Sequence, residues 1–292
     1  MSQQSITPEL RQWVAEQIRV GHLPEAVIEA MVQAGWKEDL AASALDGALQ
    51  ARRGQAPTSA ALAAGPAGGM VGTGVRMPGL DLAQSPRRVD AGDRWVDVIA
   101  ALGLPRVVLL GGLLSAEECD ALVEAARPRM ARSLTVETRT GGEELNPDRT
   151  SHGMFFNRGE GELVTRIEQR IAHLLRWPVE NGEGMQVLQY RPGAEYKPHY
   201  DYFDPVEPGT PTIVKRGGQR VATLLMYLNE PTRGGGTTFP DVGLEVAPVR
   251  GNAVFFSYDR PHPATRTLHG GAPVIEGEKW VATKWLRERE FV

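Results

Sequence analysis

The apolar residues among the first fifty positions recur every three or four residues, the spacing of one face of an α-helix. A helix start is indicated at Thr7-Pro8, because a threonine hydroxyl can cap the first turn and proline is tolerated there. Gly21 and Gly35 interrupt the pattern, so we expect three short helices over residues 1–52. Their apolar faces are Leu10, Trp13, Val14 and Ile18, then Leu23, Val27, Ile28, Met31 and Val32, then Leu40, Leu45 and Leu49. So short a segment buries only a small core, which predicts marginal stability in isolation.

The helical pattern is lost between residues 53 and 90. The stretch GQAPTSAALAAGPAGGMVGTG is rich in glycine, alanine and proline and carries hardly any charge. Such a composition buries too little apolar surface to hold a single conformation. We therefore interpret residues 53–90 as a flexible linker.

Periodicity returns in residues 91–292, first at helical and then at strand spacing. Helices are predicted for SAEECDALVEAARP, where Ser115 and Glu118 are spaced as a capping box, and for residues 162–177. Runs typical of strands are RVVLLGGLL, MQVLQYRP, QRVATLLMYLN, NAVFFSY, TRTLHGG and KWVATKWLRE. Helices followed by many short strands and turns indicate a mainly β domain with helical support (α+β), a sandwich or jelly roll with its core over residues 185–288.

Composition narrows the class of partner and the compartment. The 292 residues carry a net charge of −4 with a pI of about 5.9, which argues against a nucleic-acid partner, because phosphate binding needs clustered lysine and arginine. The single cysteine, Cys119, excludes an internal disulfide, and we expect it to be a small buried side chain. No apolar run approaches the ~18 residues that span a bilayer, so no membrane partner is expected. The N-terminus does not resemble a signal peptide, so the cytoplasm is the expected location.

The stretch YKPHYDYF places His199 and Asp201 two residues apart among aromatic rings. On an extended chain these side chains point the same way and could bind one divalent ion, although such a pair also arises by chance and then serves as an ordinary hydrogen-bonded pair. A metal site needs another histidine from a distant strand. We favour His269, which ends a strand-like run before Gly270-Gly271, over His262 between two prolines.

Two histidines and one carboxylate occupy one face of an octahedron and leave three positions open. This ligand set is typical of non-haem Fe(II) oxygenases. Zinc more often takes closed Cys/His sets or a helical His-Glu-x-x-His, and the sequence contains neither. The pattern therefore favours Fe(II), with open positions for a co-substrate.

A candidate cation for that co-substrate is Lys279 in GEKWVATKWLRE. Strand alternation places Lys279 on one face with Val281, Thr283 and Trp285, so the face carries one cation among apolar and aromatic groups. A lysine buried alone is costly, whereas a dianion reaching its ammonium would offset that cost. 2-Oxoglutarate fits, since its keto acid end can chelate iron while its distal carboxylate meets the lysine. The alternative is a lysine of an edge strand, exposed to water.

Five stretches between residues 130 and 288 resemble, in order, the catalytic domain of prolyl 4-hydroxylases, members of the iron- and 2-oxoglutarate-dependent dioxygenase superfamily. They are RTSHGMFF, ENGEGMQVLQYRPGAEYKPHYDYF, GGQRVATLLMYLNEPTRGGGTTFP, GNAVFF and LHGGAPVIEGEKWVATKWLRE. The resemblance implies a double-stranded β-helix (jelly roll). It also implies hydroxylation of prolyl residues at the 4-position in a protein or peptide, using Fe(2+), 2-oxoglutarate and O2, with ascorbate as reductant and release of succinate and CO2.

Carried over residue by residue, the resemblance assigns roles to nine positions. His199, Asp201 and His269 would bind the iron, and Lys279 the distal carboxylate of 2-oxoglutarate. Tyr190 and Thr237 would provide hydroxyls that hydrogen-bond the same co-substrate, and Trp285 would line the pocket. Glu183 and Arg220 would contact the peptide substrate.

Other features leave alternatives open. TPTIVKRGG (residues 210–218) lengthens the loop after the iron pair, and no collagen-type peptide-binding domain is visible, so collagen is not the expected substrate. The same chemistry on another side chain, a free amino acid or a small molecule remains an alternative. The AGW turn near Gly35 resembles ubiquitin-associated-like three-helix modules, which would bind a protein partner. A non-catalytic adaptor that uses this module is a further hypothesis for the whole protein. For the module itself, the alternative is a helical appendage without any partner.

Overall fold

The computed structural model describes residues 77–292 except 134, 137–141 and 145–147, together with residues distributed over 7–45. The chain divides into two units, Met1–Leu62 and Ala63–Val292. In the first unit, α2 (Pro24–Gln33) is the helix whose bounds are defined. A small core there is formed by Val14, Val27, Met31, Ala41, Ala44 and Leu45. The three-helix arrangement and its ubiquitin-associated-like character stay predictions, because much of residues 1–52 and most of the linker lie outside the described residues.

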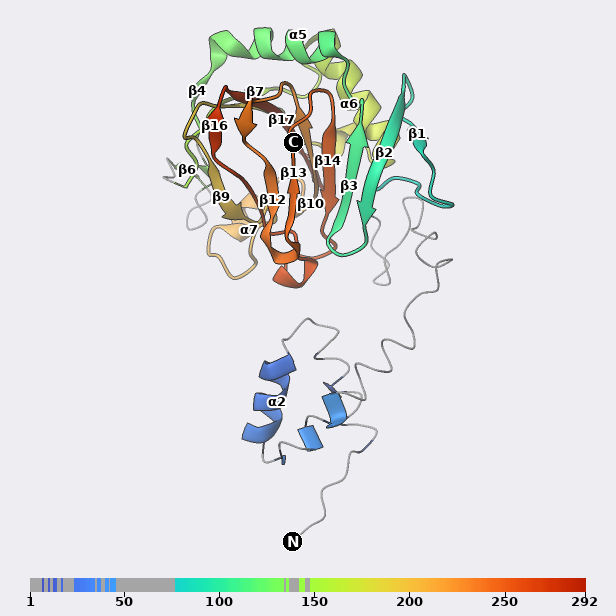
Figure 1. Ribbon diagram of the computed structural model, residues 1–292, viewed down its shortest axis with the longest axis vertical. Helices are drawn as coiled ribbons and strands as arrows, with labels where there is room; N and C mark the ends of the chain where they lie inside the picture. The colour runs from blue at the N-terminus through green and yellow to red at the C-terminus, as the bar shows by residue number, and fades with distance from the viewer. Residues whose placement is uncertain are drawn as a thin grey trace. The chain divides into compact units, whose positions relative to one another are not determined.

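The second unit is built on a large antiparallel sheet with the strand order β1-β2-β3-β14-β10-β17-β8-β7-β4 (Figure 1). The strand bounds are β1 Arg88–Asp90, β2 Trp95–Leu102, β3 Arg106–Gly111, β14 Ala253–Ser257, β10 Arg220–Tyr227, β17 Lys279–Arg287, β8 Met185–Tyr190, β7 His152–Phe156 and β4 Ala131–Arg132. The predicted strands of the catalytic region match β3, β8, β10, β14 and β17 closely. These central strands are almost wholly buried, because both faces of the sheet are covered.

A second sheet has the strand order β13-β12-β15-β9 and lies over β10 and β17 of the large sheet in Figure 1. Its strands are β13 Leu244–Val246, β12 Thr237–Phe239, β15 His269–Gly271 and β9 Tyr196–His199. Aromatic and aliphatic side chains from the facing surfaces, among them Tyr190, Tyr227, Phe239 and Phe256, form one core between the two sheets. This is the mainly β, jelly-roll arrangement expected from the sequence.

Two helices support the other face of the large sheet. α5 (Ala116–Ala126) begins with the predicted capping box, since Ser115 and Glu118 each accept a hydrogen bond from the other's backbone N–H. α6 (Gly161–Leu175) buries its apolar face, including Ile167 and Ile171, in a core shared with that side of the sheet. Cys119 on α5 is fully buried in this core, as predicted from the sequence.

Shorter elements complete the second unit. They are η1 Arg127–Arg129, β5 Thr135–Val136, β6 Glu143–Glu144, η2 Val179–Asn181, α7 Thr210–Ile213, β11 Arg233–Gly234, η3 Pro240–Val242, η4 Pro263–Thr265 and β16 Val274–Glu276. Of these, α7 lies within the lengthened loop after the iron pair. No helix of the described residues has the length and apolar character that crossing a membrane would require.

The compact part of the second unit starts earlier than the boundary at residue 91 suggested by the sequence. Met77 and Leu80 are buried in the core beneath the helices, and the backbone N–H of Gly79 donates to the carbonyl of Leu175 on α6. Residues 88–90 form strand β1. The proline- and glycine-containing composition of this stretch resembles a linker locally, but its few apolar side chains pack against a helix that is distant in sequence.

Candidate metal centre and co-substrate pocket

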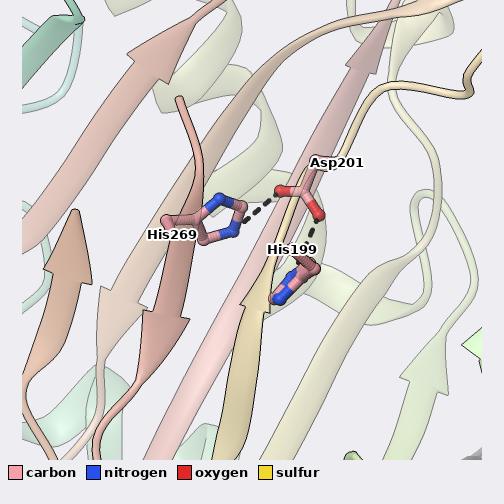
Figure 2. A group of neighbouring side chains, drawn as sticks. All are labelled: His199, Asp201 and His269. Atoms are coloured by element: carbon pink, nitrogen blue, oxygen red, sulfur yellow. Dashed lines mark ion pairs between the residues drawn. The ribbon is translucent and has the colours of Figure 1, made fainter. Parts of the chain in front are cut away.

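The structure brings together the three residues proposed as iron ligands (Figure 2). In the β9–β15 pairing His199 lies directly opposite His269, and Asp201 follows in the bend after β9. Oδ1 of Asp201 is 3.7 Å from Nε2 of His199, and Oδ2 is 3.4 Å from Nε2 of His269. One ligand atom from each residue lies within 4.8 Å of the other two, so a single ion can contact all three side chains.

Backbone carbonyls determine which nitrogen of each imidazole faces the ion. Nδ1 of His199 is 2.9 Å from the carbonyl oxygen of Lys197, and Nδ1 of His269 is 2.9 Å from that of Thr267. A neutral imidazole that donates through Nδ1 presents the lone pair of Nε2. Both Nε2 atoms face Asp201, which is the arrangement a metal ion requires.

The charge states of the triad suit a divalent cation. Burial, followed by the neighbouring His269, lowers the pKa of His199, so its ring is neutral at pH 7. Burial alone would raise the pKa of Asp201, but His269 and His199 outweigh burial and hold this pKa well below its usual range. The site therefore offers two imidazole nitrogens and one carboxylate, a set that fits Fe(II).

Close backbone packing holds the two histidine strands together. A Cβ at Gly270 would lie 2.9 Å from the carbonyl oxygen of Tyr196 on β9, so a side chain at this position would displace the strand. The TRTLH pattern predicted that His269 ends a strand. In the structure His269 instead begins strand β15. The reason is the preceding η4 turn, after which Arg266 adopts a left-handed conformation with φ of 53°.

A cavity below the triad contains the predicted co-substrate residues. Its lining includes the triad together with Lys279, Tyr190, Thr237 and Trp285. Lys279 begins β17 opposite Tyr190 on β8, and the alternation along β17 is as predicted, with Val281, Thr283 and Trp285 lining the same cavity. Thr237 accepts a hydrogen bond of 2.7 Å from the hydroxyl of Tyr227.

The ammonium of Lys279 is buried and has no hydrogen-bond or ion-pair partner among the described residues. The side chain is only 3% exposed, which excludes the alternative of an edge lysine in water. The nearest ring centroids to its Nζ belong to Tyr190 at 5.5 Å and Tyr227 at 5.8 Å. A buried cation without a counter-ion is costly, so the cavity fits a ligand that brings an anionic group to it.

This lysine leads to a pH-dependence prediction. Burial lowers the pKa of Lys279 to about 8, and the opposing effect of Glu245 is smaller. As the pH rises above about 8 the free enzyme loses the ammonium, while the carboxylates of 2-oxoglutarate stay ionised. We expect the KM for 2-oxoglutarate to be flat near pH 7 and to rise by about tenfold per unit above pH 8.

The measurement is the initial rate of succinate formation against 2-oxoglutarate concentration between pH 6.5 and 9.5. A KM that stays constant through pH 9.5 would contradict a titrating counter-ion at this position. The apparent affinity for Fe(II) serves as the control, because Lys279 is not an iron ligand.

A larger cleft of about 590 Å³ lies on the outer side of the triad. It is lined by Trp285, Arg220, aromatic residues from Tyr196 to Phe203, and residues of the loop containing α7, including Asp204, Glu207 and Ile213. The cleft and the inner cavity share His199, Asp201 and Trp285. The triad therefore lies between a pocket for a small dianion and an outer cleft with room for a larger substrate.

Glu183 and Arg220, predicted to contact the substrate, form a buried ion pair with each other. The guanidinium of Arg220 donates to both carboxylate oxygens of Glu183, at 2.7 and 2.9 Å. Arg220 also stacks on the ring of Trp285 at 4.1 Å, and Arg287 provides a second cation 3.0 Å from Glu183. Arg220 lines the cleft, whereas Glu183 is not part of its lining, so Glu183 is placed to hold Arg220.

Of the remaining histidines, the three that the structure describes are not part of this cluster. His262 uses Nδ1 to accept a hydrogen bond from the backbone of Ala264 and caps η4. His152 begins β7, and His173 on α6 is 3.7 Å from the carboxylate of Asp90. His22 lies outside the described residues.

Three further residues at the site were not singled out from the sequence. Thr223 donates to Oδ2 of Asp201 at 2.7 Å, and its hydroxyl oxygen is 3.1 Å from that of Tyr258. Arg149 lines both cavities and stacks on Tyr196 at 4.9 Å. Threonine and tyrosine commonly have ordinary packing roles, so no local pattern marked Thr223 or Tyr258 as part of the site. For Arg149 a signal was available, because it lies in the RTSHGMFF stretch that resembles the family.

Comparison with known proteins identifies a family model, similar sequences and a similar solved structure. A family model described as the 2OG-Fe(II) oxygenase superfamily matches residues 185–287, a range that contains the triad and Lys279. Prolyl 4-hydroxylase 5 of Arabidopsis thaliana is 42% identical over 222 residues, covering 68% of this chain and 74% of that protein. Prolyl 4-hydroxylase 1 of the same plant is 42% identical over 203 residues, covering 63% and 70%. A solved structure of a viral collagen prolyl hydroxylase from Paramecium Bursaria Chlorella virus-1, complexed with 2OG, is 31% identical with a TM-score of 0.49, covering 62% of this chain and 95% of that one.

Proposed function

Because the chain belongs to the prolyl 4-hydroxylase family of Fe(II)- and 2-oxoglutarate-dependent dioxygenases, we propose that it hydroxylates prolyl residues of a protein or peptide at the 4-position. One oxygen atom of O2 enters the prolyl ring and the other enters succinate, as 2-oxoglutarate loses CO2. The observation that carries the proposal is a single cavity lined both by the His199–Asp201–His269 triad and by the buried ammonium of Lys279, which has no ion-pair partner in the part of the chain that the structure describes.

Each part of the cavity has a role in this reaction. His199, Asp201 and His269 would hold Fe(II), which supplies oxygen activation when it is bound. Lys279 would bind the distal carboxylate of 2-oxoglutarate, with the hydroxyls of Tyr190 and Thr237 as further donors. Trp285 lies between this pocket and the outer cleft, where it limits the access of water to the reacting groups.

A peptide is the substrate class that the outer cleft favours. A sealed pocket would suit a free amino acid, whereas this cleft of about 590 Å³ extends from β4 to the loop that contains α7. We assign Arg220 to the cleft as a donor to the substrate backbone. Its pairing with Glu183 and stacking on Trp285 would hold the guanidinium in place.

Further assignments go beyond the catalytic site. Ascorbate is proposed as the reductant that returns the iron to the ferrous state, on the resemblance to the family. The cytoplasm is the proposed compartment. Residues 1–52 are proposed to be a three-helix, ubiquitin-associated-like module that binds a protein partner, joined by a linker to the dioxygenase domain.

The proposed activity can be tested with the full chain, Fe(II), 2-oxoglutarate and proline-rich peptides. We expect succinate to form and the peptide to gain the mass of one oxygen atom, with 4-hydroxyproline found after hydrolysis. Control peptides carry alanine in place of each proline, and free proline tests the small-molecule alternative. Iron-loaded enzyme that never forms succinate would contradict the enzymatic assignment. Succinate formation with hydroxylation elsewhere would contradict the prolyl assignment alone.

A further inference from the structure

The carboxylate of Asp201 accepts a hydrogen bond from a residue outside the triad. The hydroxyl of Thr223, on β10, lies 2.7 Å from Oδ2 of Asp201. No corresponding donor is found for Oδ1 among the described residues, and this oxygen faces Nε2 of His199. The two oxygens of the proposed iron ligand are therefore not equivalent, and only one is held by a hydroxyl.

The direction of the hydrogen bonds follows from the chemistry of the groups. An ionised carboxylate can only accept, so the Thr223 hydroxyl donates its single proton to Oδ2. The Tyr258 hydroxyl, 3.1 Å from the Thr223 oxygen, must then donate to Thr223. Burial, followed by the charge of Asp201, raises the pKa of Tyr258 well above its usual value, so Tyr258 keeps the proton it donates.

The fold fixes this row of hydroxyls. Thr223 is 1% exposed and Tyr258 2% exposed, and Thr223 lies opposite Phe256 in the β10–β14 pairing. The backbone N–H of Tyr258 donates to the carbonyl of Val221 at 3.0 Å, which anchors the tyrosine to the neighbouring strand. Thr223 thus lies on a strand of the large sheet and Tyr258 directly follows strand β14 of that sheet, while Asp201 lies in the bend that follows β9 of the second sheet.

We propose that Thr223, supported by Tyr258, is a positioning residue that fixes the rotation of the Asp201 carboxylate and commits the iron to its other oxygen. A carboxylate without this donor can turn about Cβ–Cγ and can bind an ion through both oxygens. With Oδ2 held, Asp201 binds through one oxygen and leaves coordination positions open for the keto acid and O2. This inference rests on the proposed iron site and is independent of the choice of substrate.

The test compares Fe(II) affinity among variants of the full chain, without oxygen and at saturating 2-oxoglutarate, by the visible absorption of the complex. Thr223→Val preserves shape but removes the donor, and we expect it to weaken Fe(II) binding by about tenfold to a hundredfold. Thr223→Ser retains a hydroxyl and should restore most of the affinity. Tyr258→Phe should cause a smaller loss, because Thr223 keeps its proton for Asp201.

The matched control is Ser257→Ala. Ser257 is buried on β14 beside Tyr258, and its hydroxyl has no hydrogen-bond partner among the described residues, so its removal should leave Fe(II) affinity unchanged. The melting temperature of each metal-free variant reports its folding. Equal Fe(II) affinity in wild type and Thr223→Val would overturn the positioning role, as would a Thr223→Ser variant as weak as the valine. Wild-type protein that fails to bind Fe(II) would instead refute the proposed function itself.

Discussion

Replacement of His269 by alanine is expected to abolish both Fe(II) binding and the formation of succinate. The proposed site has three ligands, and His269 contributes one of its two imidazoles, with Nε2 directed at Asp201 by the bond from Nδ1 to Thr267. Loss of the metal removes several kcal/mol of transition-state stabilisation, so turnover should fall by at least about a thousandfold. Iron content after anaerobic loading and the rate of succinate formation are the measurements.

His262→Ala is the matched control for this variant. His262 lies in the connection between β14 and β15, but it caps the η4 turn and is not part of the cluster. Its replacement should preserve Fe(II) binding and turnover. If His269→Ala kept a full complement of iron, or if His262→Ala lost it, the ligand set assigned here would be wrong.

Lys279→Met is expected to raise the KM for 2-oxoglutarate by at least about thirtyfold while leaving Fe(II) affinity intact. Methionine replaces most of the apolar length of the lysine but has no charge to meet the distal carboxylate. Removing one partner of a buried, hydrogen-bonded ion pair costs about 2 kcal/mol or more, which corresponds to this factor. The loss should appear in KM for the co-substrate and in its dissociation constant, measured anaerobically with iron present.

Lys215→Met provides the control for this effect, because Lys215 is exposed in the loop near the outer cleft and does not line the inner cavity. Its KM for 2-oxoglutarate should match that of the wild type. An unchanged KM in Lys279→Met would assign the distal carboxylate to another group. A simultaneous loss of iron would indicate a damaged fold and would be visible in the melting temperature.

Much of the secondary structure of the catalytic region could be predicted from local pattern. The alternation in KWVATKWLRE separated the cavity face of β17 from the face beneath the helices, and the Ser115–Glu118 spacing predicted the start of α5. Such patterns involve residues close together in sequence, so they can be recognised without knowing how the rest of the chain folds. The start of the domain was harder to predict, since Met77 is buried in a core whose other members are mostly distant in sequence.

The metal site was predictable to the extent that its chemistry is carried by residue type. The spacing of His199 and Asp201 suggested a pair of ligands, and the glycines after His269 suggested close packing. The residues that support Asp201 from behind have no such signature in the sequence. Nothing in the sequence distinguishes Thr223 and Tyr258 from other residues in or next to strands, and only the structure shows their hydroxyls in a row behind Asp201. Glu183 was assigned to the substrate, yet its carboxylate is occupied by Arg220 and Arg287.

The sequence by itself determined which chemical groups are available and on which face of each strand they lie, because side-chain identity and strand alternation are local properties. Only the tertiary structure decided that His199 lies opposite His269, that Lys279 is buried without an ion-pair partner among the described residues, and that a hydroxyl holds one oxygen of Asp201. These outcomes depend on the register between strands far apart in the chain and on which side chains are buried away from water and from charged partners. Both are set by the packing of the two sheets against each other.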